Sequence, residues 1–297
     1  MIFIIYLGSQ AGNFAINAIM KYPEVADYVV SACTRQKLIK SRRKIKKMIK
    51  TQEENRDSIV GHIIARDYRK SRALSSRGID YSCDGNRTLS EIFVGKEEDL
   101  EKVLHEWQQI DRETPQKEAD FLGWDIAFLT NYIIQLHHGF VSSQTKFMTD
   151  LAYKVAESNQ ARNPMIRSVA ELFDVTGKRL EAKGRQEEQE LFPYLISLHE
   201  ATAKGACLKA AAFGPVAGPI GQIRTEGERI VAALGQIRKL TNNFTPSPYT
   251  SSTCEILYKL LAEYEADALL HLHLENNILF PRAVQTEDCL RANRQII

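Results

Sequence analysis

The chain has 297 residues, of which 44% are apolar and 26% are charged, and its formal net charge at pH 7 is +2. This length and composition indicate a globular protein of one large or two modest domains and exclude a collagen-like or low-complexity chain. The charge is uneven, because residues 1–47 carry nine Lys or Arg and two Asp or Glu, which leaves a net charge of −5 on the rest. A weakly acidic body argues against nucleic acid as the main partner.

The cysteines and the hydropathy pattern indicate the cellular compartment of the protein and whether it spans a membrane. Five cysteines are scattered along the chain with no C-x-x-C pair: Cys33, Cys83, Cys207, Cys254 and Cys289. This pattern is unlike a disulfide framework or a zinc knuckle and predicts a reducing cytoplasm. No apolar run reaches the roughly 18–20 residues that a bilayer requires, so we expect no membrane span.

Residues 1–56 are interpreted as a basic leader. The stretch RQKLIKSRRKIKKMIK holds nine basic residues and no acidic one. Three interpretations stay open: an arm that binds nucleic acid or an anionic membrane, a solvated and partly helical leader without a specific role, and a native chain that starts at Met48. The last is favoured, because the acidic segment TQEENRDSIVGHII follows at once.

A small helical domain is expected over residues 57–112. RDSIVGHIIARDYRKSRAL and EEDLEKVLHEWQQI both show helical periodicity. Between them, Thr88 and Glu91 have capping-box spacing, which predicts a short helix. Cys83 lies on the turn before that helix and is a candidate redox thiol. A lone cysteine on a turn is usually without function, and reactivity requires a lowered pKa.

Residues 118–285 are expected to form an up-down four-helix bundle. Long segments with helical periodicity occupy roughly 121–157, 164–200, 219–241 and 253–280. Stretches with glycine, proline or hydroxyl residues separate them, and strand-like alternation is missing. The predicted fold class is therefore all-α, with this bundle preceded by the small helical domain.

One motif occurs twice in the bundle. KGRQEEQELFP aligns with HLHLENNILFP, so that Glu187 corresponds to Glu275 and Lys183 to His271. His271 and Glu275 are four residues apart, so their side chains project from the same face of a helix. The apolar neighbours on that face indicate that it points toward the core. Such a pair is costly in a core unless a metal ion binds both groups. The alternatives are that the two side chains bond only to each other, or that Glu275 is exposed.

The stretch QLHHGF adds a candidate on the first bundle helix. His138 lies in an otherwise apolar segment, whereas His137 points about 100° away and is interpreted as a secondary or surface group. Metal sites in bundles take histidines and carboxylates from facing helices. His138 is therefore a candidate for the same site as the repeated motif.

Together these motifs resemble the iron–sulfur cluster repair proteins, a di-iron, hemerythrin-like family tied to nitrosative and oxidative stress. GIDYSCDGNRTLSE resembles the signature of that family's small N-terminal domain, D-Y-C-C-G-G-K with a following TL. QLHHGF, EEQELFP, GPI, LTNNFTPSP and HLHLENNILFPRA occur in the family's order and spacing. The resemblance covers residues 57–285 and implies a non-haem di-iron centre with two bridging carboxylates and four histidines.

The resemblance assigns four metal ligands to this chain. His138 stands at the first-helix histidine and His271 at the fourth-helix histidine. Glu187 and Glu275 stand at the two bridging carboxylates. In the family these two histidines serve one of the two irons, so the ligands of that iron are kept.

The ligands of the other iron are missing. Lys183 and Gly227 stand where the second and third helices supply histidine in the family, which makes Gly227 a lost ligand position. In the small domain, Ser82 replaces the first of two adjacent cysteines and leaves Cys83. One bound iron is therefore expected rather than two.

Lys183 is a candidate substitute for the charge of the second metal. Two buried carboxylates repel each other unless a cation lies between them, and an ammonium on a flexible stem can supply that charge. In the alternative, Lys183 extends to solvent and the site is partly or wholly empty.

The resemblance implies a cytoplasmic non-haem iron protein that helps to restore damaged iron–sulfur clusters, by iron delivery or nitric oxide chemistry. Its partners would be iron–sulfur proteins with damaged clusters, and the small domain would permit a homodimer. The alternative is a metal-free, degenerate paralogue that binds a partner or senses stress. An oxygen carrier fits worst, because reversible dioxygen binding of the hemerythrin type uses both irons. No catalytic residue is assigned.

Overall fold

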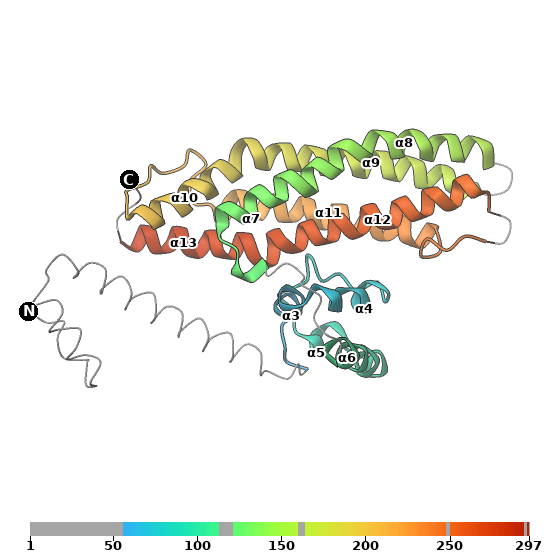
Figure 1. Ribbon diagram of the computed structural model, residues 1–297, viewed down its shortest axis with the longest axis horizontal. Helices are drawn as coiled ribbons and strands as arrows, with labels where there is room; N and C mark the ends of the chain where they lie inside the picture. Colours follow the sequence, from blue (N-terminus) through green and yellow to red (C-terminus); the bar gives the residue numbers. More distant parts are fainter. Residues whose placement is uncertain (1–55, 113–120, 160–163, 248–249, 294–295, 297) are drawn as a thin grey trace, which may run out of the picture. The chain divides into compact units, whose positions relative to one another are not determined.

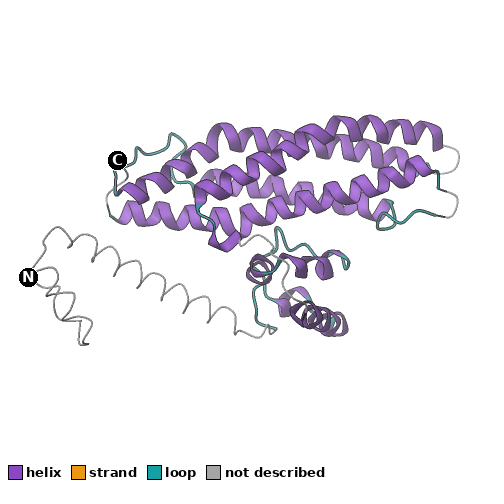
Figure 2. Ribbon diagram, viewed as in Figure 1, coloured by secondary structure: helices purple, strands orange, loops and turns teal. Residues whose placement is uncertain are grey.

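The computed structural model describes residues 56–112, 121–159, 164–247, 250–293 and 296. Within these ranges the regular elements are helices, and extended pairing is limited to isolated bridges (Figure 2). The all-α prediction is therefore confirmed. The described residues belong to one compact unit, Asn55–Ile297, and the predicted leader lies outside them except for Arg56. In the part of the chain that the structure describes, no helix is long and apolar enough to cross a bilayer.

The N-terminal part of this unit consists of short helices around a small core. They are α3 (Val60–Arg66), η2 (Tyr68–Lys70), α4 (Ser71–Ser75), α5 (Leu89–Ile92) and α6 (Glu97–Arg112). The predicted capping box at the start of α5 is confirmed, because Thr88 and Glu91 each accept the other's backbone N–H. Trp107 is fully buried, and its indole N–H donates to the Lys70 carbonyl at 2.9 Å.

Four long helices lie side by side in the C-terminal part (Figure 1). After a short turn η3 (Phe121–Gly123), the first helix runs through α7 (Ile126–Tyr132), η4 (Ile133–His138) and α8 (Gly139–Asn159). The second helix runs through α9 (Met165–Gln186), η5 (Glu187–Leu191) and α10 (Phe192–Lys204), and the third is α11 (Ala217–Leu240). The fourth helix runs through α12 (Ser252–Leu274), η6 (Glu275–Leu279) and α13 (Phe280–Ala292). Each coincides with one of the four periodic segments in the sequence, which is the up-down bundle expected there.

The repeated LFP motif produces a π-helical turn in each of two helices. The N–H of Phe192 bonds to the carbonyl of Glu187, five residues back, and Phe280 bonds to Glu275 in the same way. A proline follows each phenylalanine, and proline has no N–H and clashes with the carbonyl four residues earlier. The wider turn accommodates this conflict inside a continuous helix. Both of these π turns begin at a glutamate of the candidate site, and η4, which is also π-helical, ends at His138.

The bundle core is divided into two apolar clusters with a polar layer between them. On each long helix the residues of one cluster stop and those of the other begin within a few turns. The breaks fall between Ile133 and Val141, Leu180 and Leu191, Ile223 and Ile230, and Ala268 and Leu274. Of the bundle residues singled out from the sequence, His138, Lys183, Glu187, Gly227 and His271 lie within these breaks, and Glu275 directly follows the last one. The fold therefore gathers them at one level of the bundle.

Candidate metal centre

Four side chains converge in the polar layer of the bundle. His138 ends η4, Glu187 begins η5, His271 lies in the last turn of α12, and Glu275 begins η6. All four are buried, and one potential ligand atom from each lies within 4.8 Å of the others. Among the described residues this is the one group of three or more His, Cys, Asp or Glu side chains that could hold a metal ion. The structure thus brings together the four ligands that the resemblance implies.

The spacing and chemistry of these donors fit a metal ion. The Nε2 atoms of His138 and His271 lie 3.3 Å apart, and Glu187 Oε2 lies 3.4 Å from His138 Nε2. Two donors that are each about 2.0–2.1 Å from a tetrahedral ion are separated by about 3.3–3.4 Å. Glu187 Oε2 is also buried without a hydrogen-bond partner in the described part of the chain. Imidazole nitrogen with carboxylate oxygen suits iron, manganese or zinc.

Lys183 lies inside the site rather than at the surface. Its Nζ donates to Glu187 Oε1 at 2.6 Å and to Glu275 Oε2 at 2.5 Å, and its side chain is 1% exposed. The remaining oxygen of Glu275 is 2.8 Å from His271 Nε2. The ammonium therefore bridges the two carboxylates on one side, while the two imidazoles face them on the other. This geometry argues against the alternative in which Lys183 extends to solvent.

The protonation of the site follows from burial and from this sharing of charge. Burial and the neighbouring Glu275 raise the pKa of Glu187 to about 7. Burial acts on Glu275 in the same direction, but contacts with His271 and Lys183 outweigh it and hold the pKa of Glu275 below its usual range. Burial lowers the pKa of His271 to about 3, so this ring is neutral, and its Nε2 donates a hydrogen bond to Glu275 in the metal-free protein. Burial lowers the pKa of His138 too, but the nearby carboxylates raise it by more, so the pKa of His138 lies above the usual value for histidine.

His137 is buried and belongs to the surroundings of the site. Its Nδ1 lies 2.8 Å from Asp267 Oδ1, and its ring stacks on His271 with centroids 5.5 Å apart. Sequence reasoning left His137 as a secondary or surface group and gave no role to Asp267. Asp267 lies one helical turn before His271, which is the signal that could have identified it.

The position of the lost third-helix ligand is packed. Gly227 is buried in α11, and a Cβ added there would lie 3.1 Å from Leu272 Cδ2. Leu272 follows His271 directly in the sequence. The side of the site where the family places a histidine of the third helix is therefore occupied by an apolar side chain of the fourth.

Cys83 lies on the turn that contacts the fourth helix. The amide of Asn276 donates to the Ser82 carbonyl at 3.2 Å, and Ser82 Oγ donates to Asp80 at 2.7 Å. Burial and the Asp80 carboxylate raise the pKa of the Cys83 thiol well above its usual value. The lowered pKa that a reactive thiolate requires is therefore absent, and the redox role of Cys83 stays a prediction.

The fold and the donor set define a class: a four-helix-bundle protein with histidine and carboxylate side chains arranged for a metal in its core. Comparison with known proteins is more specific. Residues 56–111 match the ScdA_N family, which is described as a domain of unknown function (DUF542). The chain is 27% identical over 232 residues to proteins named iron-sulfur cluster repair protein YtfE from Citrobacter koseri and Escherichia coli O8, and 26% identical to that from Shigella boydii.

These alignments cover 78% of this chain and 99% of each relative. Two findings support the family assignment made from the sequence motifs. The family model matches the small domain, and the alignments with the repair proteins span nearly the whole length of those proteins. The chain is thus similar to proteins named for iron–sulfur cluster repair along nearly their whole length.

Proposed function

We propose that this chain is a non-haem iron protein of the iron–sulfur cluster repair type, with a site for one iron rather than two. It would act in the cytoplasm on iron–sulfur proteins with damaged clusters, under nitrosative or oxidative stress. The names of relatives that align over nearly their whole length support the repair role. The buried group of two imidazoles and two carboxylates supports the iron.

The observation that carries the single-iron proposal is the position of Lys183. Its ammonium contacts one oxygen of Glu187 and one of Glu275, which leaves the other oxygen of each directed to the histidines. A second cation between the same two carboxylates would meet that ammonium at close range, and like charges repel. His138, Glu187, His271 and Glu275 would therefore hold one iron, while Lys183 balances the remaining charge.

This arrangement assigns separate tasks to the protein's own groups. Bound iron would supply Lewis acidity and one-electron redox chemistry at the polar layer. His271 would bind through Nε2 after the hydrogen bond of that nitrogen to Glu275 is given up, and the carboxylates would offer one oxygen each. A site with two histidines in place of four holds iron less firmly, which favours release of iron to a damaged cluster over storage. A homodimer through the small domain stays a prediction, which light scattering on the purified protein tests.

A repair assay tests the proposed function. An iron–sulfur enzyme inactivated by nitric oxide is mixed with the iron-loaded protein, and recovery of its cluster is followed by absorbance and by its activity. We expect recovery with the native chain and none with His271→Ala or Glu275→Gln loaded in the same way. Equal recovery with the variants would contradict the proposal. Absence of iron after anaerobic loading with Fe(II) would instead favour the metal-free, partner-binding alternative.

A further inference from the structure

A second set of contacts surrounds His138, and all of it comes from the second long helix. Glu188 Oε1 lies 2.7 Å from His138 Nδ1. Phe192 stacks on the same ring, with centroids 5.7 Å apart and ring planes within 7° of parallel. A Cβ added at Gly184 would lie 3.3 Å from atoms of the ring, so glycine allows the imidazole to approach the helix backbone closely. Glu188 therefore holds the edge of the His138 ring, and Phe192 and the backbone at Gly184 pack against that ring.

These three residues are spaced four apart along the second helix. Gly184 lies in the last turn of α9, Glu188 lies in η5, and Phe192 begins α10. Residues four apart occupy neighbouring positions on one helical face, and α8 and α9 are packed together along their length. The helix that has lysine in place of its own histidine thus presents a continuous surface to the histidine of the first helix.

The adjacent glutamates contact opposite nitrogens of the same imidazole. Glu188 is at Nδ1, whereas Glu187 Oε2 lies 3.4 Å from Nε2. A carboxylate at Nδ1 accepts the proton of that nitrogen, which leaves the lone pair of the neutral ring on Nε2, directed at His271 and Glu187. His271 lacks such a partner, because its Nδ1 is buried without a hydrogen bond among the described residues.

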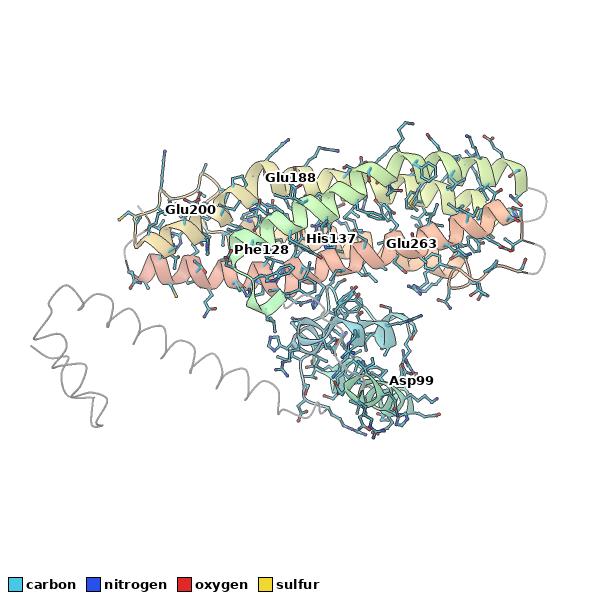
Figure 3. The ribbon with its side chains drawn as sticks, in the orientation of Figure 1. Asp99, Phe128, His137, Glu188, Glu200 and Glu263 are labelled. Atoms are coloured by element: carbon cyan, nitrogen blue, oxygen red, sulfur yellow. The ribbon has the colours of Figure 1, made fainter. Side chains whose placement is uncertain are left out.

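Glu188 is also the most exposed group that contacts a candidate ligand. Its carboxylate is 42% exposed, and it lies on the α9–α10 helix (Figure 3). It lines a cavity of about 360 Å³ that reaches both His138 and His271. Glu188 therefore separates the Nδ1 proton of His138 from solvent at the open side of the site.

We propose that Glu188 is a positioning residue: together with Gly184 and Phe192 it fixes the tautomer and the orientation of His138, so that Nε2 faces the candidate metal position. The part of this inference that concerns metal affinity rests on the proposed function. The part that concerns the tautomer does not, because it applies to the metal-free protein.

The test uses the full chain labelled with ¹⁵N at histidine. In metal-free protein, at a pH at which titration of its own signals shows the ring to be neutral, we expect a protonated Nδ1 and an unprotonated Nε2 for His138. Glu188→Ala should give a mixture of tautomers and faster exchange of the Nδ1 proton with solvent. Glu188→Gln should retain the native tautomer, since its amide oxygen still accepts that proton. The His137 signals serve as an internal reference that none of these changes should move.

Affinity for Zn(II), a diamagnetic probe, supplies the second readout. Loss of an outer partner of a ligating histidine typically lowers metal affinity about 10- to 100-fold, and we expect this for Glu188→Ala with a smaller loss for Glu188→Gln. Gly184→Ala should also weaken binding, because the ring must shift. Glu190→Ala, on the same turn and bonded only to Gln186 in the described structure, is the matched control. An unchanged tautomer in Glu188→Ala would overturn the inference, whereas native tautomer behaviour in a protein that binds no Zn(II) or Fe(II) would contradict only the proposed function.

Discussion

At the scale of single residues, the site depends on one ammonium placed between two buried carboxylates. Lys183 is as buried as the groups that it contacts, and its hydrogen bonds reach both Glu187 and Glu275. Taking three ionisable groups out of water is costly unless they satisfy one another. The lysine therefore does more than fill the place of a histidine, because it supplies the positive charge that two adjacent carboxylates need.

Removal of that charge should destabilise the metal-free protein strongly. For Lys183→Met, which keeps an unbranched side chain, we expect a loss of about 3–5 kcal/mol in the free energy of unfolding, because two carboxylates are left buried without a cation. Urea denaturation measures this, and added Zn(II) should restore part of the loss. Lys178→Met is the control, since Lys178 pairs with Asp174 at the surface and should change stability by about 0.5 kcal/mol or less. Similar values for the two variants would show that the ammonium is not needed.

Restoring two histidines, with one further substitution to make room for them, should create a second metal position. Lys183→His together with Gly227→His restores the two histidines that the family resemblance implies are missing, and removes the ammonium. The new side chain at Gly227 must displace Leu272, whose Cδ2 is 3.1 Å from the position of an added Cβ; a third change, Leu272→Ala, makes room. We expect iron content to rise by one ion per chain, as measured by elemental analysis. Either histidine alone should not produce this rise, and no gain in the triple variant would contradict the ligand assignment.

At the scale of helices, buried carboxylates away from the site tie the elements together. Glu287 in α13 accepts hydrogen bonds from the Tyr194 hydroxyl at 2.8 Å and from the Val216 N–H at 3.0 Å, and it pairs with Arg291. It thus joins α13 to α10 and to the segment before α11. Burial raises the pKa of Glu287, but the contacts with Arg291, Tyr194 and Val216 lower it by more, so the net pKa is below the usual 4.5.

This carboxylate should contribute to the pH dependence of stability in the acid range. A group with a folded-state pKa below its unfolded value stabilises the fold above the unfolded value, and that contribution is lost as the pH falls through the folded pKa. We therefore expect Glu287→Gln to be less stable than the native chain at pH 7 and to lose less stability between pH 5 and pH 3. Thermal unfolding across this range measures the difference, with Glu200→Gln, a surface change, as the control. Parallel curves for native and Glu287→Gln proteins would refute this role.

The sequence predicted the helices well and the detail around the site less well. The period of the apolar residues was enough for the four long helices, because each must bury one face. The repeated motif, the spacing of His271 and Glu275, and the histidine of QLHHGF singled out the residues that the structure brings together, and the family resemblance assigned them as ligands. Glu188 and Asp267 were missed, because an acidic residue beside a ligand is indistinguishable in sequence from one that faces solvent. The packing of Leu272 against Gly227 depends on how two helices meet, which no local pattern encodes.

At the scale of the whole described molecule, the small domain and the bundle meet at the π turn that begins with Glu275. The amide of Asn277, two residues later, donates to the Tyr81 and Ser82 carbonyls. Gly61 and Gly85 both approach this side chain, and a Cβ added to Gly85 would overlap with its Oδ1. Asn276 donates to the Ser82 carbonyl as well, so the two residues that follow a candidate metal ligand both bind the small domain.

Overpacking at this contact should weaken the attachment of the small domain. We expect Gly85→Ala to cost about 1–3 kcal/mol, because Asn277 must leave its place. Hydrogen exchange should increase in residues 57–112 before it increases in the bundle. Gly235→Ala is the control, since an added Cβ there meets no other atom within 4 Å and alanine favours a helix. Uniform destabilisation of both parts would argue that the contact does not act as an anchor.

The measurement that tests the central claim most directly is an anaerobic titration of the metal-free chain with Fe(II), followed by removal of unbound iron and a count of iron per chain. One iron is expected for the native chain and none for His271→Ala, with the same fold in both by circular dichroism. Two irons in the native chain would contradict the role given to Lys183. No iron in the native chain, or equal iron in both proteins, would contradict the assignment of the site itself.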